Sequence, residues 1–307
     1  MSAAALLLAS VFSAGTVLAL AGLGLLINEK AGISNLGAEG MMLCAALAGY
    51  AACVHTESQW LGFAAGMLAA GVLAAALGWL VIWLNTNQTA SGLALSLLGA
   101  GLSAFVGVPY TQQALPASQG GYAIPVFSQL PFIGPALFAQ HPLVYFSVAL
   151  ALFLAWFFNR SHAGLVLRSV GESPESAHAL GYPVRLIRFT ATVAGGALCG
   201  LAGAYLSLVY TPQWVEGMVA GKGWIALALI PFATWRPIYI LLGAWLFGGV
   251  TILQFWLQSQ GIGIASQWLT MLPYLSIIAV LVLISRNPLW IRVNKPAALG
   301  KPFHPGK

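Results

Sequence analysis

Two carboxylates, Glu39 and Glu216, stand beside glycines at polar breaks between long apolar stretches. An ionisable side chain at membrane depth costs about 2.5–3.5 kcal/mol on insertion scales, so it usually faces protein or water and often marks a pathway. The same carboxylates could instead accept backbone N–H groups at a helix start near the membrane surface. The sequence leaves both interpretations open, and it makes Glu39, Glu216 and the nearby Asn35 candidate pathway or gate residues.

Three aromatic residues, Tyr210, Trp214 and Trp224, flank the second of these breaks. Aromatic faces suit stacking on a planar base, but Trp and Tyr also gather at membrane interfaces. The interface explanation is the more common one. Trp214 and Trp224 nevertheless join the candidate pathway residues.

The most informative polar stretch is 159–188, which reads NRSHAGLVLRSVGESPESAHALGYPVRLIR. Ser173 is a good N-cap, and Pro174 is suited to the first helical position that follows it. Gly181 is suited to the left-handed position that ends a helix. The spacing therefore predicts a capped helix of about two turns over 174–180, inside an otherwise polar loop.

The side chains that usually carry enzyme or metal chemistry do not form a recognisable set in this sequence. No nucleophile and base pair in a catalytic pattern, and the five histidines and three cysteines lack the spacing of metal ligands. No Gly-x4-Gly-Lys-Ser/Thr motif occurs, because the string Ala-Gly-Lys-Gly at 220–223 lacks the hydroxyl residue and the earlier glycine. We expect no enzyme activity, no cofactor and no ATP hydrolysis by this chain itself.

The elements that must position these residues are membrane spans. Of the 307 residues, 60% are apolar and 6% are charged, whereas a soluble domain carries roughly 25% charged residues. A spanning helix needs about 20 apolar residues, and alternating ten-residue segments typical of a membrane β-barrel are absent. The sequence predicts an all-α, polytopic bundle of about nine spans, at 3–27, 37–54, 60–84, 89–108, 142–158, 189–209, 223–234, 238–257 and 267–284.

The basic residues predict an orientation in the membrane. If the C-terminus is cytoplasmic, eleven of the twelve Lys and Arg residues fall on the cytoplasmic side, and only Lys222 does not. Because Lys and Arg are enriched in cytoplasmic loops, we expect the N-terminus outside, 109–141 as an external loop and 159–188 inside. We expect one transmembrane domain over 1–284 and a cytoplasmic tail over 285–307; the net charge of +6 reflects loop placement rather than nucleic-acid binding.

Spans 1–4 and 6–9 share a rough pattern that suggests an internal repeat. Each set starts with a Gly/Ala-rich helix, continues with a break containing Glu-Gly, at Glu39 and Glu216, and then has an apolar segment and a Gly-rich helix. Span 5 lies between the sets, so the second set runs in the opposite direction. Inverted repeats of this kind are frequent in transporters.

The motif Glu175-Ser-Ala-x3-Gly181 resembles the Glu-Ala-Ala-x3-Gly loop of ABC importer permeases, with Ser in one Ala position. The wider string SVGESPESAHALGYPVRLIRFTATVAGGALCGLAGAYLSL resembles the branched-chain amino acid, ribose and nucleoside permease family. The segments NLGAEGMML at 35–43 and YTPQWVEGMVAGKGWIAL at 210–227 are similar to the shorter permease of nucleoside or purine uptake systems. The resemblance covers most of the chain, and Pro231-Phe232 is a departure from the Gly-rich pattern of that family.

The resemblance implies alternating access in a bacterial cytoplasmic membrane, with ATP bound by a separate cytoplasmic ATPase. It also implies a second, longer permease and an extracytoplasmic substrate-binding protein. Sugar or branched-chain amino acid permeases of the same family are the first alternative to nucleoside uptake, and an ion-coupled carrier using Glu39 or Glu216 is an alternative of another class. The residues implied to couple the permease to the ATPase are Gly171, Glu172, Pro174, Glu175, Ala177 and Gly181.

Overall fold

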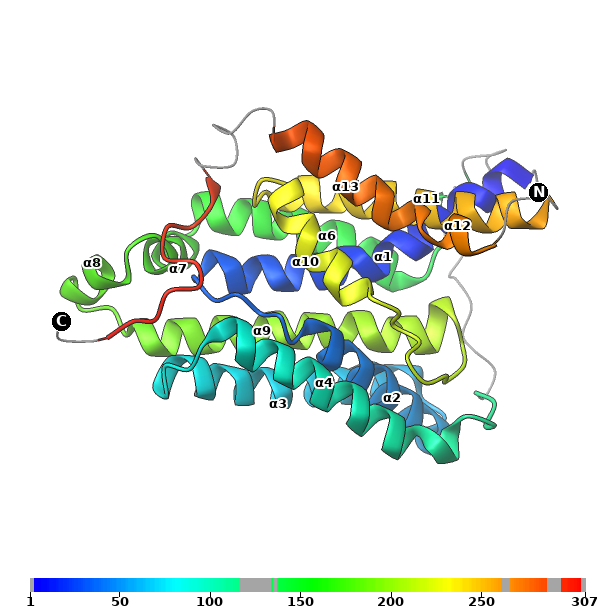
Figure 1. Ribbon diagram of the computed structural model, residues 1–307, viewed down its shortest axis with the longest axis horizontal. Coiled ribbons are helices and arrows are strands. Elements are labelled where there is room, and N and C mark those ends of the chain that lie inside the picture. The colour runs from blue at the N-terminus through cyan, green and yellow to red at the C-terminus, as the bar shows by residue number, and fades with distance from the viewer. Residues whose placement is uncertain (1–2, 116–133, 135–136, 261–265, 286–293, 305–307) are drawn as a thin grey trace.

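The regular elements of the protein are helices arranged as an elongated bundle (Figure 1). The computed structural model describes residues 3–115, 134, 137–260, 266–285 and 294–304. Seven of its helices are long and apolar enough to cross a membrane, which confirms the predicted polytopic membrane bundle. The helices are α1 (Ala3–Lys30), α2 (Ala38–Thr56), α3 (Gln59–Gly78), α4 (Gln88–Gly107), α6 (Pro142–Arg160), α7 (His162–Glu172), α8 (Pro174–Ala179), α9 (Val184–Tyr205), α10 (Lys222–Phe232), α11 (Pro237–Ser259), α12 (Ser266–Thr270) and α13 (Leu272–Ser285).

Two of the nine predicted spans are shorter in the structure than a full crossing. The predicted span 223–234 is α10, which has 11 residues, and the predicted span 267–284 is divided into α12 and the 14-residue α13. A helix rises about 1.5 Å per residue, so α10 covers only about half of a bilayer's hydrocarbon layer. The π-helical turns Trp79–Trp83 and Leu206–Tyr210 extend α3 and α9.

The helices α2 and α10 both begin inside the bundle rather than at one of its ends (Figure 1). Residues 31–37 lead from the end of α1 back into the bundle, and residues 211–221 do the same from the opposite end, after α9. Non-helical backbone at membrane depth is tolerated where it is buried in protein or lines a cavity, because its polar groups find no partners in lipid. These two breaks are therefore the places where function is most expected.

Asn35 supplies partners for the first break. The side chain is fully buried; its Oδ1 accepts from Gly37 N–H (3.1 Å), and its Nδ2 donates to Asn28 Oδ1 (3.0 Å). Asn28 Nδ2 in turn donates to the Ala191 carbonyl of α9 (2.7 Å). This chain of amides ties the 31–37 segment to α1 and α9.

The central contact of the bundle is the crossing of α1 and α9, which run in opposite directions (Figure 1). A Cβ atom on Gly24 would lie 2.5 Å from the Gly195 carbonyl oxygen, so the two backbones touch where they cross. Small residues permit such close approach between membrane helices. Larger side chains at either position would push the two helices apart.

The packing of the helices follows the predicted inverted repeat. Helices α1, α2 and α3 of the first repeat correspond to α9, α10 and α11 of the second. Accordingly, α1 packs on α11 and its counterpart α9 packs on α3. In the same way, α2 packs on α9 and its counterpart α10 packs on α1. The pairs α2–α4 and α10–α13 correspond in the same way. Each contact thus has a counterpart when α1–α4 are matched to α9, α10, α11 and α13. The helix α6, the predicted fifth span, lies outside this relation and packs mainly on α7, α11 and α1.

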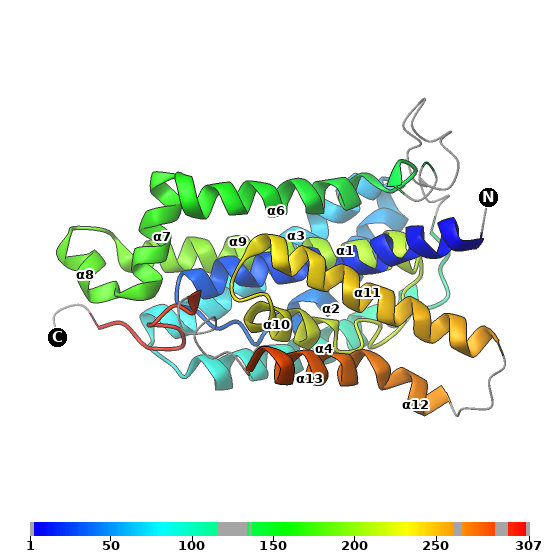
Figure 2. The same cartoon turned by 90° about the horizontal axis from the view of Figure 1, so that it is seen from above.

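One end of the bundle carries α7, α8 and the segment 294–304, as both views show (Figures 1 and 2). The sequence predicted α8 but not α7. Ser161 caps α7 by accepting from Gly164 N–H (2.9 Å), so the polar stretch 159–188 contains two helices. Of the predicted tail 285–307, the segment 294–304 packs back on this end of the bundle. The described residues do not include 286–293, 305–307 or most of the predicted external loop 109–141.

The predicted orientation can be tested with single cysteines at the two ends of the bundle. Leu180 is 76% exposed beside α8, and Glu57 is exposed in the α2–α3 turn at the other end, while the native cysteines are buried. We expect a membrane-impermeant thiol reagent to label Glu57→Cys in intact cells and Leu180→Cys only after permeabilisation. Labelling of Leu180→Cys in intact cells would place α8 outside and reverse the topology.

Candidate functional site

The N-termini of α2 and α10 are joined inside the bundle by one carboxylate. Glu39, in the first turn of α2, accepts from Gly221 N–H through Oε1 (2.8 Å) and from Gly223 N–H through Oε2 (2.8 Å). Free N–H groups and the positive end of the helix dipole make a helix N-terminus favourable for a carboxylate. We call this contact between Glu39 and residues 221–223 the helix junction.

The two donors of the helix junction are glycines for different reasons. Gly221 has a φ of +79°, in the left-handed region that glycine adopts without strain. A Cβ atom on Gly223 would lie 2.7 Å from Glu39 Cα and 2.8 Å from its Oε2. The backbone of α10 can therefore approach the carboxylate only because position 223 has no side chain.

A cavity of about 240 Å³ adjoins the helix junction, between α1, α10, α11 and α13. Its wall combines aromatic rings with polar groups, among them Tyr210, Lys222, Gln254 and Tyr274. Tyr274 also donates its hydroxyl hydrogen to the Ala220 carbonyl (3.0 Å), next to the junction. A few polar groups in a largely apolar and aromatic wall are typical of small-molecule sites.

Of the other candidate pathway residues, Trp224 directly follows the helix junction and its backbone N–H also contacts Glu39, whereas Glu216 and Trp214 take no part in it. Glu216 is exposed, and Trp224 is 36% exposed. Trp214 is only 2% exposed and packs in a cluster with Tyr50. The structure therefore brings Glu39, and not Glu216, to the start of the other half-helix.

Sequence reasoning found Glu39 but missed its partners. One of the two interpretations left open was a carboxylate that accepts backbone N–H groups at a helix start; the N–H groups that Glu39 accepts belong to the start of α10, about 180 residues further along the chain. The signal that could have identified the partners is the Gly-Lys-Gly string at 221–223, directly after a polar break. Two glycines at a helix start allow another group to approach the backbone closely.

The predicted helix at the other candidate site is confirmed as α8. Ser173 Oγ accepts from Ser176 N–H (3.3 Å), and Gly181 has a φ of +87°. Gly181 N–H donates to the His178 carbonyl (2.9 Å), which completes the helix end. The capping signals in the sequence therefore predicted both limits of this helix.

The short helix α8 has a packed inner side and an open outer side. Pro174 and Ala177 are buried, and Ala177 belongs to an apolar cluster with Val170, Val184 and Phe303. The side chains of Glu175 and Leu180 are exposed, at the tip of the bundle. The inner contacts hold α8 on the bundle and leave its outer side exposed.

Gly171 and Glu172 connect α7 to the end of α1 and to the tail. The Gly171 carbonyl accepts from Ala298 N–H (3.0 Å), and Glu172 Oε2 accepts from Ala297 N–H (3.3 Å). A Cβ atom on Gly171 would collide with the Lys30 carbonyl. The end of α7 is therefore in backbone contact with the end of α1, directly before the 31–37 break.

Comparison with known proteins agrees with this architecture. Residues 7–282 match the family described as branched-chain amino acid transport system, permease component. A putative glucose ABC transporter permease of Haloferax volcanii is 41% identical over 97% of both chains. A nucleoside ABC transporter permease of Lactococcus lactis is 30% identical over 91% of this chain and 92% of that one, and a guanosine ABC transporter permease of Bacillus subtilis is 29% identical over 94% and 93%.

No solved structure matches the chain. The family match covers far more than half of the sequence, and it includes both half-helix breaks and the α7–α8 segment. A permease of this kind is not itself catalytic and works with an ATPase and a substrate-binding protein. The chain therefore belongs to the branched-chain amino acid transport system permease family, as the membrane-spanning subunit of an ABC importer.

Proposed function

We propose that this permease imports a sugar, with a nucleoside as the second candidate. The relative named as a glucose permease is 41% identical, and the relatives named for nucleoside and guanosine are 30% and 29% identical. This order supports the sugar alternative over the nucleoside assignment that the sequence motifs favoured. Both solutes carry a hydroxylated ring, so the mixed aromatic and polar wall of the cavity at the helix junction suits either.

The observation that carries the transport proposal is the helix junction beside this cavity. The N-termini of α2 and α10 meet at Glu39, and the cavity is lined by Ala220 and Lys222 from the start of α10. Substrate sites in transporters often lie where discontinuous helices of inverted repeats meet. We assign Glu39 as the group that holds the two half-helices together while the solute passes beside them.

In the proposed mechanism, movement begins at α8 and reaches the helix junction through α7 and α1. An ATPase docked on α8 shifts α8 and α7, and Gly171 transmits the shift to the end of α1 through backbone contact. From there the amides of Asn28 and Asn35 connect the 31–37 segment to α2, whose first turn carries Glu39. The path is one of contiguous contacts, and coupling along it is a proposal that mutation tests. A second, longer permease that completes the pathway stays a prediction from the family resemblance.

The experiment is uptake by the complete transporter in proteoliposomes, with ATP inside or outside and with radiolabelled glucose or guanosine. We expect ATP-dependent accumulation of glucose that guanosine does not compete. Accumulation of guanosine alone would replace the sugar assignment by the nucleoside one. Accumulation driven by a proton gradient without the ATPase would instead support an ion-coupled carrier and contradict the whole proposal.

A further inference from the structure

Three cations gather around one cavity at the α7–α8 end of the bundle. The cavity has a volume of about 400 Å³ and lies between α1, α6, α7 and the start of α11, and its lining includes Lys30, Arg168 and Arg236. No carboxylate is part of this lining among the described residues. We call it the basic cavity. A second cavity of about 400 Å³ adjoins it and shares Lys30 and Arg168.

The cations of the basic cavity have neutral partners within the part of the chain that the structure describes. Lys30 Nζ donates to the Asn294 carbonyl (3.1 Å), and Arg168 Nη1 donates to the Phe158 carbonyl (3.2 Å). The guanidinium of Arg236 lies 5.6 Å from the centre of the Tyr239 ring. Three like charges around one space repel each other, so an anion bound there is stabilised by all three.

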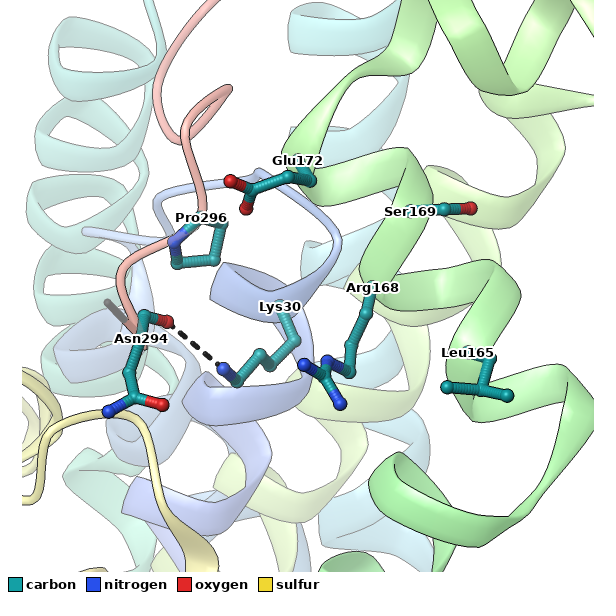
Figure 3. Close-up of a pocket in the computed structure, with 7 residues that line it drawn as sticks. All are labelled: Lys30, Leu165, Arg168, Ser169, Glu172, Asn294 and Pro296. Atoms are coloured by element: carbon teal, nitrogen blue, oxygen red, sulfur yellow. Dashed lines mark hydrogen bonds between the residues drawn. The ribbon is translucent and has the colours of Figure 1, made fainter. Parts of the chain in front are cut away.

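The nearby carboxylates Glu172 and Glu29 attract Lys30, but neither lines the basic cavity. Figure 3 shows Lys30 and Arg168 directed into the adjoining cavity from α1 and α7, with Glu172 at its edge. Glu172 accepts from Ala297 N–H, and the buried Glu29 accepts from the Trp235 indole N–H (2.5 Å). The positive charge of the basic cavity is therefore not cancelled by a carboxylate in its wall.

The basic cavity also has an apolar side that continues along the bundle. Ala155 and Phe158 of α6 and Ile238 of α11 line it. One turn further along α6 lies Leu152 (58% exposed), and Ile238, Leu242 and Leu246 form one exposed face of α11 at four-residue steps. This apolar surface on the packed helices α6 and α11 suits an acyl chain, whereas a free phosphate has no apolar part that could bind to it.

We propose that the basic cavity binds the headgroup phosphate of an anionic phospholipid, with its acyl chains along the surface between α6 and α11. The cations lie at the end of the bundle that the charge distribution predicts to be cytoplasmic, where anionic lipids and basic juxtamembrane residues attract each other. The bound lipid joins the end of α1, α7 and the start of α11. It thereby stabilises the segment that connects α8 to the 31–37 break.

The test is lipid retention by the purified full-length chain in detergent, measured by native mass spectrometry with phosphatidylglycerol or phosphatidylcholine. Removing one cation near a membrane surface lowers the affinity for an anionic lipid by roughly fivefold. We therefore expect the double variant Arg168→Gln, Arg236→Gln to bind phosphatidylglycerol about 30-fold more weakly. Arg160→Gln, an exposed arginine at the same end that does not line the cavity, is the matched control and should retain it as the native chain does. Equal retention by the double variant and the control would overturn the proposal.

Two further measurements distinguish a bound lipid from a bound free anion, and the second does not depend on the folding of any variant. Glycerol 3-phosphate should not displace the lipid; displacement at equal concentration would assign the basic cavity to a free phosphate compound and overturn the lipid proposal. With the unmodified protein, a photoreactive phosphatidylglycerol should label α6 and α11 near Ala155 and Ile238. Labelling elsewhere, with none on these helices, would also overturn it, whatever the variants do.

Discussion

Replacing Glu39 with Gln lowers ATP-dependent uptake by about tenfold or more and lowers the melting temperature of the chain. Each carboxylate oxygen accepts from one glycine, and in the amide an NH2 group takes the place of one oxygen, so in this geometry one of the two N–H groups faces a donor and loses its partner. A buried N–H left without a partner costs about 1–3 kcal/mol, and about 1.4 kcal/mol corresponds to tenfold in an equilibrium constant. Proteoliposome uptake and thermal unfolding in detergent measure the two effects.

The matched control for this prediction is Glu216→Gln. Glu216 lies in the corresponding break of the second repeat but is exposed, and among the described residues its carboxylate accepts no hydrogen bond. We expect its uptake and melting temperature to stay near the native values. Equal behaviour of Glu39→Gln and Glu216→Gln would show that the helix junction contributes neither to stability nor to transport.

The second large effect is expected from Leu180→Asp at the tip of α8. Leu180 is 76% exposed in the isolated chain, so the substitution leaves its folding intact, but a carboxylate would replace the apolar group that the ATPase is expected to cover. Burial of a leucine side chain contributes about 1.5–3 kcal/mol, so the affinity between permease and ATPase should fall by roughly tenfold to a hundredfold. Binding of the purified ATPase to the chain in nanodiscs measures this directly.

Leu165→Asp is the control for α8, because Leu165 is a comparably exposed leucine (50%) on the neighbouring helix α7. It should bind the ATPase as the native chain does. Both variants should unfold at the native temperature, which separates loss of docking from loss of structure. Native ATPase affinity and uptake in Leu180→Asp would remove α8 from the coupling mechanism.

The parts of the fold that the sequence predicted are those set by local signals. The caps at Ser173 and Gly181 define α8, and long apolar runs define the seven full spans, because both depend on neighbouring residues. The helix α7 was missed because it is short and its few large apolar residues, Leu165, Val166, Leu167 and Val170, stand among polar residues and glycines. The short length of α10 was already implied by the predicted span 223–234, but local composition could not show that this helix begins inside the bundle (Figure 1).

The contacts that connect distant segments could not be predicted from spacing. Glu39 meets Gly221 and Gly223 only because the second repeat is inverted, which places two helix starts face to face. The tail was expected to be a simple extension, yet Ala298 and Phe303 pack against α7 and α8. Such contacts depend on the three-dimensional arrangement of spans, for which a single sequence provides only the weak repeat pattern.

The crossing at Gly24 and Gly195 has a consequence for how the bundle moves. The helices α1 and α9 touch there without intervening side chains, at a point away from both of their ends. When two rods tilt about a point between their ends, the gap that widens at one end narrows at the other. In the mechanism proposed above, this crossing would be the pivot: a push at the α8 end would close the protein on one side of the membrane while opening it on the other.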